Sequence, residues 1–229
     1  MIIPYHQRLA VKEKIAKDCG HTSRCELCET RQIFVDALGD SNIPVKYWFL
    51  KYSDFKGSPN IKEATTKYLD NLNDNYLAGK GLCFSGTYGT GKTYSICSIL
   101  KKALMTPYVG GSRNYTCFYV SFTDLVSYSM AFQNRDEFTS KVMNADIFAL
   151  DEVDSRHLPS SEEANQLFGA MFEKVIRYRI QNCLPTILAT NNSKIEDVFT
   201  GQHKRVVESL GSSLEQIIAF GKDHRLKKE

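Results

Sequence analysis

From residue 81 onward, short apolar runs alternate with longer stretches in which apolar residues recur every three or four positions. Runs of this length that are rich in Val, Ile and Phe are typical of buried strands, and they cover residues 81–86, 117–122, 146–153 and 185–191. The intervening stretches predict helices over residues 92–104, 122–133, 161–180 and 204–216. Strands that alternate with helices form a parallel sheet, so the pattern predicts an α/β fold with helices on both faces of the sheet.

The chain divides into three expected segments. Residues 1–40 are expected to form a small helical N-terminal unit, residues 41–78 a linker with a leading helix, and residues 79–229 the α/β core. Pro44 interrupts any helix in the linker. Apolar residues at helical spacing then predict one helix across the stretch that ends at Gly79.

Composition narrows the class of protein. The 229 residues are 42% hydrophobic and 24% charged, and the formal net charge of +3 does not by itself indicate a nucleic-acid-binding protein. No apolar run approaches the roughly 20 residues needed to span a bilayer. The chain has seven cysteines, and several lie in apolar runs, which favours reduced core thiols: Cys83, Cys97, Cys117 and Cys183. We therefore expect a soluble cytoplasmic protein that has no contact with a membrane.

The stretch GTYGTGKT matches the phosphate-loop pattern G-x-x-x-x-G-K-[ST] between a predicted strand and a predicted helix. Glycines at these positions let successive backbone N–H groups point toward an anion. We expect Lys92 to reach the β- and γ-phosphates of ATP and Thr93 to bind Mg²⁺. The residues expected to contact ATP or ADP are Gly86, Thr87, Tyr88, Gly89, Thr90, Gly91, Lys92, Thr93, Tyr94 and Asp151.

Two carboxylates come directly after the apolar run 147–150 of the predicted strand 146–153. Ligands of open α/β sheets bind at the carboxyl ends of the strands, where Asp151 and Glu152 emerge. We expect Asp151 to bind Mg²⁺ together with Thr93, and Glu152 to act as the general base that activates water. Asp154, two residues further on, is an alternative for either role.

A third strand, within PTILATNN, ends in polar residues at the same edge. Asn191 is expected to orient the attacking water or to sense the γ-phosphate, with Thr190 and Asn192 as near alternatives. Three strand ends that converge on one phosphate site indicate a P-loop ATPase of the ASCE class, and more narrowly an AAA+ module.

From about residue 42 to residue 225 the chain resembles the AAA+ ATPases of the DnaC/DnaI helicase-loader and IstB transposition-helper group. The similar segments are NIPVKYWFLKYSDF, YVSFTDLVSY, FEKVIRYRIQNCLPTILATNN and IIAFGKDHR, the last ending in Arg225. The resemblance implies a reduced or absent lid, ATP-dependent self-association through the nucleotide site, and an arginine that reaches a neighbour's γ-phosphate. Ser209 falls where that arginine is expected, so either Arg205, one turn earlier on the same face, takes its place or the chain lacks this arginine.

The N-terminal segment CGHTSRCELC contains four residues of the types that bind zinc: Cys19, His21, Cys25 and Cys28. A structural Zn²⁺ would stabilise a unit that has little core of its own. His6 is a substitute for His21, and the alternative is three free thiols with an exposed histidine. The resemblance implies that this unit docks on a replicative helicase.

These features favour a helicase loader, an ATPase that places a hexameric replicative helicase on single-stranded DNA. The candidate DNA-facing residues are Arg113, Tyr115 and Arg135, because cations and aromatic rings suit single strands. Two alternatives stay open at this point. One is a transposition helper on duplex DNA, and the other is a nucleotide-dependent adaptor with little hydrolysis.

Overall fold

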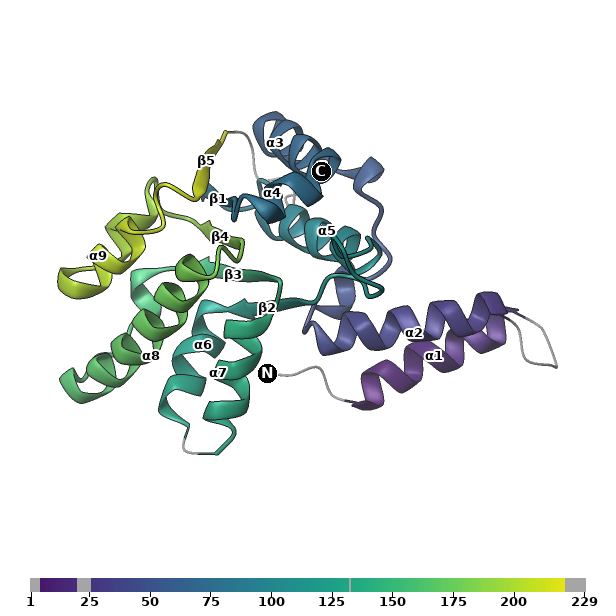
Figure 1. Cartoon of the computed structure of the whole chain (residues 1–229), viewed down its shortest axis with the longest axis horizontal. Coiled ribbons are helices and arrows are strands. Elements are labelled where there is room, and N and C mark those ends of the chain that lie inside the picture. The colour runs from purple at the N-terminus through teal and green to yellow at the C-terminus, as the bar shows by residue number, and fades with distance from the viewer. Residues whose placement is uncertain (1–4, 20–25, 132, 221–229) are drawn as a thin grey trace, which may run out of the picture.

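In the computed structural model, which describes residues 5–19, 26–131 and 133–220, five strands form one parallel sheet (Figure 1). The strand order is β2-β3-β4-β1-β5, and every pair of neighbours is parallel. The strands are β1 (Gly81–Gly86), β2 (Cys117–Ser121), β3 (Ile147–Val153), β4 (Thr186–Thr190) and β5 (Leu214–Ala219). The predicted parallel α/β sheet is therefore confirmed.

Helices cover both faces of this sheet (Figure 1). On one face lie α2 (Glu26–Asp40), α3 (Pro59–Asp70), α4 (Leu72–Leu77) and α5 (Lys92–Leu104). On the other face lie α6 (Phe122–Met130), α7 (Arg135–Asn144), α8 (Glu162–Gln181) and α9 (Gly201–Glu208). Short 3-10 turns occur at η1 (Val45–Tyr47), η2 (Tyr52–Asp54), η3 (Ser155–His157) and η4 (Ile195–Val198).

The strands separate two hydrophobic cores because successive side chains point to opposite faces. In β3, Ile147 and Ala149 pack with α5, whereas Phe148 and Leu150 pack with α6 and α8. All four side chains are buried. This double burial explains why the strand is a continuous apolar run and not an alternating one.

Three helix predictions differ from the structure. The helix expected to end at Gly79 is two helices, because Asn71 leaves the helical conformation and its side chain bonds the Lys67 carbonyl at 2.9 Å. Helix α7 was not predicted, since Phe138 and Val142 are its only buried large apolar residues. The helix expected over 204–216 is wrong: α9 ends at Glu208, and the chain enters β5, which pairs with β1 along its whole length.

The N-terminal helices α1 (Tyr5–Cys19) and α2 pack side by side as a hairpin (Figure 1). Lys12 and Asp36 pair across it at 2.6 Å. Val35 and Leu38 of α2 are fully buried in the same core as α5 and β1. The described part of the N-terminal unit therefore packs directly on the α/β core.

The expected zinc ligands lie outside what the structure describes, because residues 20–25 and the side chains of Cys19 and Cys28 are not part of the description. His6 is wrong as a substitute ligand. It sits in the first turn of α1, thirteen residues before Cys19, and a helix rises about 1.5 Å per residue, so the two lie about 20 Å apart. Within the described part of the chain, no cluster of three or more His, Cys, Asp or Glu side chains could hold a metal ion.

Two further expectations are tested by the described residues. Cys83, Cys97 and Cys117 are buried free thiols, as predicted, but Cys183 is exposed, because it occupies the turn after α8 with a φ of 50°. In residues 5–19, 26–131 and 133–220, no helix is long and apolar enough to cross a membrane. The prediction of a reduced or absent lid concerns the chain after residue 195, where the described residues up to 220 form η4, the short helix α9 and β5.

The buried side chain of Arg179 in α8 connects the end of α7 with the start of β4. Its side chain is fully buried, and the guanidinium donates to the carbonyls of Val142 (2.9 Å), Ala145 (2.8 Å) and Pro185 (2.7 Å) and to the Thr186 hydroxyl (3.1 Å). Burial lowers the pKa of this arginine to about 9. Arg179 therefore satisfies carbonyls at the end of α7 and at the start of β4 that are cut off from water.

We predict that Arg179→Met lowers the free energy of unfolding by about 3 kcal/mol or more, because several buried carbonyls lose their donor. The matched control is Arg177→Met, on the same helix. Arg177 forms an exposed pair with Glu173, which is worth about 0.5 kcal/mol. Denaturant titration measures both losses, and equal losses would contradict the structural role of Arg179.

Candidate functional site

The phosphate loop joins β1 to α5 in a conformation that depends on its glycines. Gly86, Gly89 and Gly91 have φ values of 117°, 71° and 97°, a region that favours glycine. The Lys92 ammonium bends back over the loop and donates to the carbonyls of Gly86 (2.6 Å) and Thr87 (2.7 Å). The loop thus forms a curved cradle, with its lysine inside, at the N-terminus of α5.

The end of β3 directs two carboxylates to different environments. Asp151 is buried, and its oxygens accept hydrogen bonds from the Tyr119 hydroxyl (2.9 Å) and the Glu152 backbone N–H (2.8 Å). Burial and the charge of Asp151 raise the pKa of Tyr119, so this hydroxyl stays a donor. Glu152 is exposed at a φ of 57°, where the register between β3 and β4 shifts. The bulge turns Glu152 out of the strand and places it beside Asp151.

The structure at the end of β4 distinguishes the three candidates for the residue that orients the attacking water or senses the γ-phosphate. The Thr190 hydroxyl is fully buried, donates to the Val153 carbonyl (2.7 Å) and accepts the Asn192 backbone N–H (3.1 Å). The hydrogen bonds of the Thr190 hydroxyl therefore stabilise the contact between β4 and β3. Asn191 lines the cavity beside the phosphate loop, whereas Asn192 does not.

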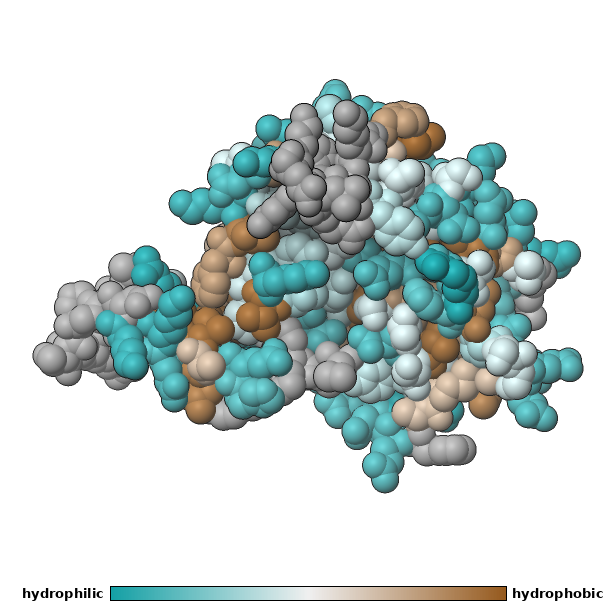
Figure 2. Space-filling view, turned by 180° about the vertical axis from the view of Figure 1, so that it is seen from behind, coloured by the Kyte–Doolittle hydropathy of each residue, from teal (hydrophilic) through white to brown (hydrophobic). Residues whose placement is uncertain are grey.

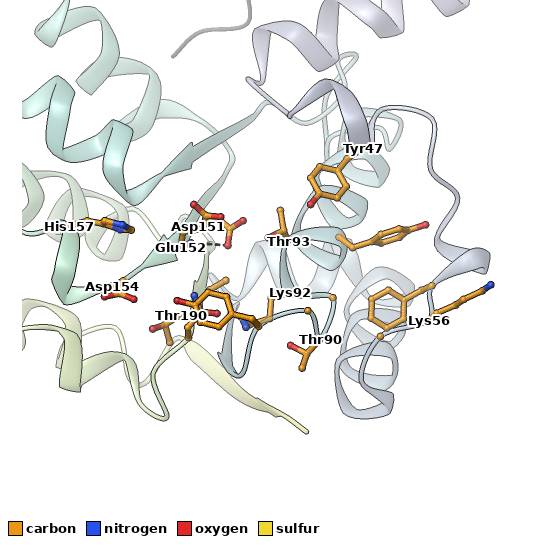
Figure 3. Close-up of a pocket in the computed structure, with 18 of the residues that line it drawn as sticks. Tyr47, Lys56, Thr90, Lys92, Thr93, Asp151, Glu152, Asp154, His157 and Thr190 are labelled. Atoms are coloured by element: carbon orange, nitrogen blue, oxygen red, sulfur yellow. Dashed lines mark hydrogen bonds between the residues drawn. The ribbon is translucent and has the colours of Figure 1, made fainter. Parts of the chain in front are cut away.

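These strand ends open into one cavity of about 470 Å³. Figure 3 shows Lys92 and Thr93 across the cavity from Asp151 and Glu152. The loop residues that line it are Tyr88, Gly89, Thr90, Gly91, Lys92, Thr93 and Tyr94, whereas Gly86 and Thr87 contribute the carbonyls that hold Lys92. The structure thus gathers the predicted nucleotide residues around one space.

The wall opposite the carboxylates comes from the linker, which the sequence did not mark as part of the site. Phe55 and Gly57 line the cavity, and the Ser58 backbone N–H donates to the Thr90 carbonyl at 2.9 Å. The buried Lys101 of α5 donates to the carbonyls of Tyr47 (2.7 Å) and Leu50 and fixes the start of this wall. The linker is therefore a built part of the nucleotide cavity.

Tyr47 is a site residue that the sequence did not indicate. Its ring stands over Thr93 in Figure 3, and its hydroxyl interacts with the Thr93 side chain. Burial, with Cys97 and Asp151 adding to it, raises the pKa of Tyr47 to about 12. The hydroxyl is therefore neutral at physiological pH and can donate to Thr93 or to an anion.

The residues present fit ATP with Mg²⁺. Thr93 and Asp151 face the same cavity, and a hydroxyl with a carboxylate is the oxygen ligand set that Mg²⁺ takes beside phosphate. Lys92 donates to neutral carbonyls in this structure, and charged phosphate oxygens would accept stronger hydrogen bonds from it. When bound, Mg²⁺ would neutralise charge on the phosphates, while Glu152 is exposed and adjacent to receive a proton from water.

Several predicted residues lie elsewhere. Arg205 is exposed on α9 and does not line the cavity of its own chain. Tyr115 is wrong as a DNA-stacking residue, because it is buried against Tyr76 and Tyr108 in the hydrophobic core. Arg113 is engaged by the buried Asp146 in a two-point contact and lies over the Tyr108 ring at 4.1 Å.

Asp154 is also not a free carboxylate. It is buried and pairs with Arg156 at 2.7 Å, and the hydrogen bonds from Arg156 lower its pKa. Arg156 lines the cavity as well. No sequence motif contains this arginine, so it was not predicted as a site residue, although its position five residues after Asp151 places it at the same sheet edge.

Family comparison agrees with this geometry. Residues 82–210 match the "ATPase family associated with various cellular activities (AAA)". Since the match covers more than half of the chain, the protein belongs to the AAA family of ATPases. A search of curated proteins found no match.

Several solved structures of low sequence identity share this fold. The chain is similar to the crystal structure of the DnaI, with 20% identity, a TM-score of 0.62, and coverage of 80% of this chain and 94% of that one. For the crystal structure of the DnaC helicase loader the identity is 21%, the TM-score 0.59 and the coverage 77% and 100%. For AMPPCP-bound DnaA from Aquifex aeolicus the values are 20%, 0.56, 76% and 51%. The predicted resemblance is confirmed at the level of the fold.

We predict that Gly91→Ala weakens ATP binding by more than tenfold. A Cβ at Gly91 would lie 2.5 Å from the Phe55 ring, so either the linker wall or the loop must move. Gly110→Ala is the matched control, because Gly110 also has a positive φ, of 75°, but nothing within 4 Å. Both substitutions strain the backbone by roughly 1–2 kcal/mol.

Calorimetric titration with ATP separates the two effects. Gly110→Ala is expected to bind ATP with wild-type affinity. Its loss of thermal stability from backbone strain is expected to be similar to the loss from backbone strain in Gly91→Ala. Normal ATP affinity in the Gly91 variant would contradict the close packing of the linker on the phosphate loop.

Proposed function

We propose that the protein is an ATP-dependent DNA replication factor that loads a hexameric replicative helicase onto single-stranded DNA. The observation that carries this proposal is one cavity lined by the expected ATP-binding residues, on a fold similar to DnaI and the DnaC helicase loader over most of the chain. ATP binding and hydrolysis would control assembly with the helicase and release from it.

In the proposed reaction Glu152 accepts a proton from the attacking water, and Asn191 orients that water. Lys92 binds the β- and γ-phosphates, and Asp151 with Thr93 holds Mg²⁺. The support is that all five side chains line one cavity. The oxygens of Asp151 are held by Tyr119 and by the backbone, whereas Glu152 is exposed to the cavity.

Self-association is part of the proposal because Arg205 cannot serve its own chain. It lies on the exposed side of α9, outside the cavity. An arginine in that place is available to a neighbouring subunit. We propose that Arg205 reaches the ATP of an adjacent subunit, so that ATP favours a stack of subunits on the DNA strand.

The surface offers a docking place for the helicase beside the N-terminal hairpin. A groove of about 940 Å³ runs between α2 and the core, lined by Ile33, Phe34, Met105 and Ala145 among others. Ile33 is 69% exposed and Met105 57% exposed. Figure 2 shows hydrophobic side chains gathered where the arm of α1 and α2 meets the rest of the molecule. Exposed apolar surface of this kind is typical of a protein interface.

Arg135 is the remaining candidate for DNA contact. It begins α7 and is partly exposed, whereas Arg113 is held by Asp146 and Tyr115 is buried. A cation at this position would contact phosphate and would not read sequence.

We predict that Glu152→Gln reduces the steady-state rate of ATP hydrolysis by at least about a hundredfold, because loss of a general base typically costs 10²–10⁴ in rate. ATP affinity is expected to stay within a few-fold of the wild type. Glu215→Gln, at an exposed position of β5, is the matched control. If the ATPase rate does not change with Glu152→Gln, only the nucleotide-dependent adaptor remains.

A second test compares the ATPase rate with no DNA, with single-stranded DNA and with duplex DNA. Stimulation of the rate by duplex DNA alone would favour the transposition helper.

We predict that Ile33→Glu reduces capture of the purified replicative helicase by at least about tenfold, because a charge would be placed in an apolar interface. Leu167→Glu is the matched control, since Leu167 is similarly exposed on α8, far along the chain from the groove. If the wild-type chain, with and without ATP, does not bind the helicase, the loader function is wrong. Equal effects of the two variants would contradict the position of the interface.

A further inference from the structure

Arg156 reaches across the mouth of the nucleotide cavity from the carboxylate side. It lies in η3, directly after β3, and its Nη2 donates to the Tyr88 hydroxyl at 2.6 Å. Tyr88 is the third residue of the phosphate loop and comes from the other side of the cavity. This contact joins two segments that are 68 residues apart in the chain.

The direction of the guanidinium is fixed by Asp154. This buried carboxylate accepts hydrogen bonds from the Arg156 backbone N–H (2.9 Å), from Nε (3.0 Å) and from Nη2 (2.7 Å). A two-point contact with a carboxylate orients the planar guanidinium as well as binding it. The Arg156 side chain is still 67% exposed, and it is one of the residues that line the cavity.

The hydrogen bond to Tyr88 is not needed to form the η3 turn. The backbone N–H of Arg156 already closes that turn on Asp154. A neutral phenol hydroxyl is a weaker acceptor for a guanidinium than a phosphate oxygen. The Tyr88 hydroxyl therefore occupies a position from which an anion would displace it.

Lys92 shows the same arrangement on the other side of the loop. Its ammonium is held by the neutral carbonyls of Gly86 and Thr87. Arg156 bonds the next residue, Tyr88. Two cations therefore meet the first three residues of the loop, and both line the same cavity as Asp151 and Glu152.

We propose that Arg156 binds the terminal phosphate of ATP in its own subunit, by exchanging the Tyr88 hydroxyl for a phosphate oxygen. ADP lacks that phosphate, so Arg156 distinguishes ATP from ADP. Asp154 is a positioning residue that keeps the guanidinium in place. The inference rests on the ATPase site and not on the proposed role in helicase loading, so either can fail without the other.

The test is the affinity for a non-hydrolysable ATP analogue and for ADP, measured by calorimetry with Mg²⁺. Arg156→Ala is expected to weaken the analogue on the order of tenfold, as for the loss of one charge-assisted hydrogen bond at a partly exposed site. ADP affinity is expected to stay within twofold. Arg156→Lys keeps the charge without the two-point contact and is expected to fall between Arg156→Ala and the wild type.

Two further variants keep the test decisive. Arg177→Ala removes another exposed arginine–carboxylate pair, remote from the cavity, and is expected to change neither affinity. Tyr88→Phe removes the competing hydroxyl and is expected to leave analogue affinity equal or up to a few-fold tighter. Equal weakening of analogue and ADP by Arg156→Ala, or no weakening of either, would overturn the proposal. A loss of analogue affinity in Tyr88→Phe would overturn the exchange.

Discussion

Parallel pairing of the five strands in the order β2-β3-β4-β1-β5 is the constraint on which the site depends. Because all strands run in one direction, their carboxyl ends meet at one edge. The phosphate loop leaves β1 there, Asp151 and Glu152 leave β3, and Asn191 leaves β4, which lies between them. Residues about 60 and 100 positions after the loop thus reach the same cavity. The bulge at the end of β3 completes the arrangement, because it turns Glu152 out of the regular alternation.

A second layer of the site precedes the sheet in sequence. The buried Lys101 holds linker carbonyls, the Ser58 N–H bonds the Thr90 carbonyl, and the Phe55 ring packs on Gly91. These contacts make the linker one wall of the nucleotide cavity. Movement of the linker would therefore shift the phosphate loop. The linker also follows α2, which lines the groove beside it. This continuity would give a physical route between the nucleotide state and the partner that we propose binds on the N-terminal side.

Much of the fold and the centre of the site could be predicted from the sequence. Strands β1 to β4 are continuous apolar runs because both of their faces are buried, and the glycines of the phosphate loop reflect local backbone needs. The residue pattern alone missed strand β5, whose closing position only the family resemblance of IIAFGKDHR indicated, since only Ala219 of its residues is buried. Tyr115 and Arg113 have the composition of a DNA-binding surface, but their partners, Tyr76 and Asp146, are distant in sequence. Arg156 had no signal for the same reason: its partner Tyr88 is known only from the fold.

The central claim is that three strand ends form one site for ATP with Mg²⁺. It is tested most directly by the ATP affinity of the wild type and of Asp151→Asn, each measured with Mg²⁺ and with a chelator. The account predicts that removing Mg²⁺ weakens ATP binding to the wild type and changes binding to Asp151→Asn much less, because the metal has already lost its protein carboxylate. A full Mg²⁺ dependence in Asp151→Asn would contradict the claim, since the carboxylate at the end of β3 would then have no part in the site.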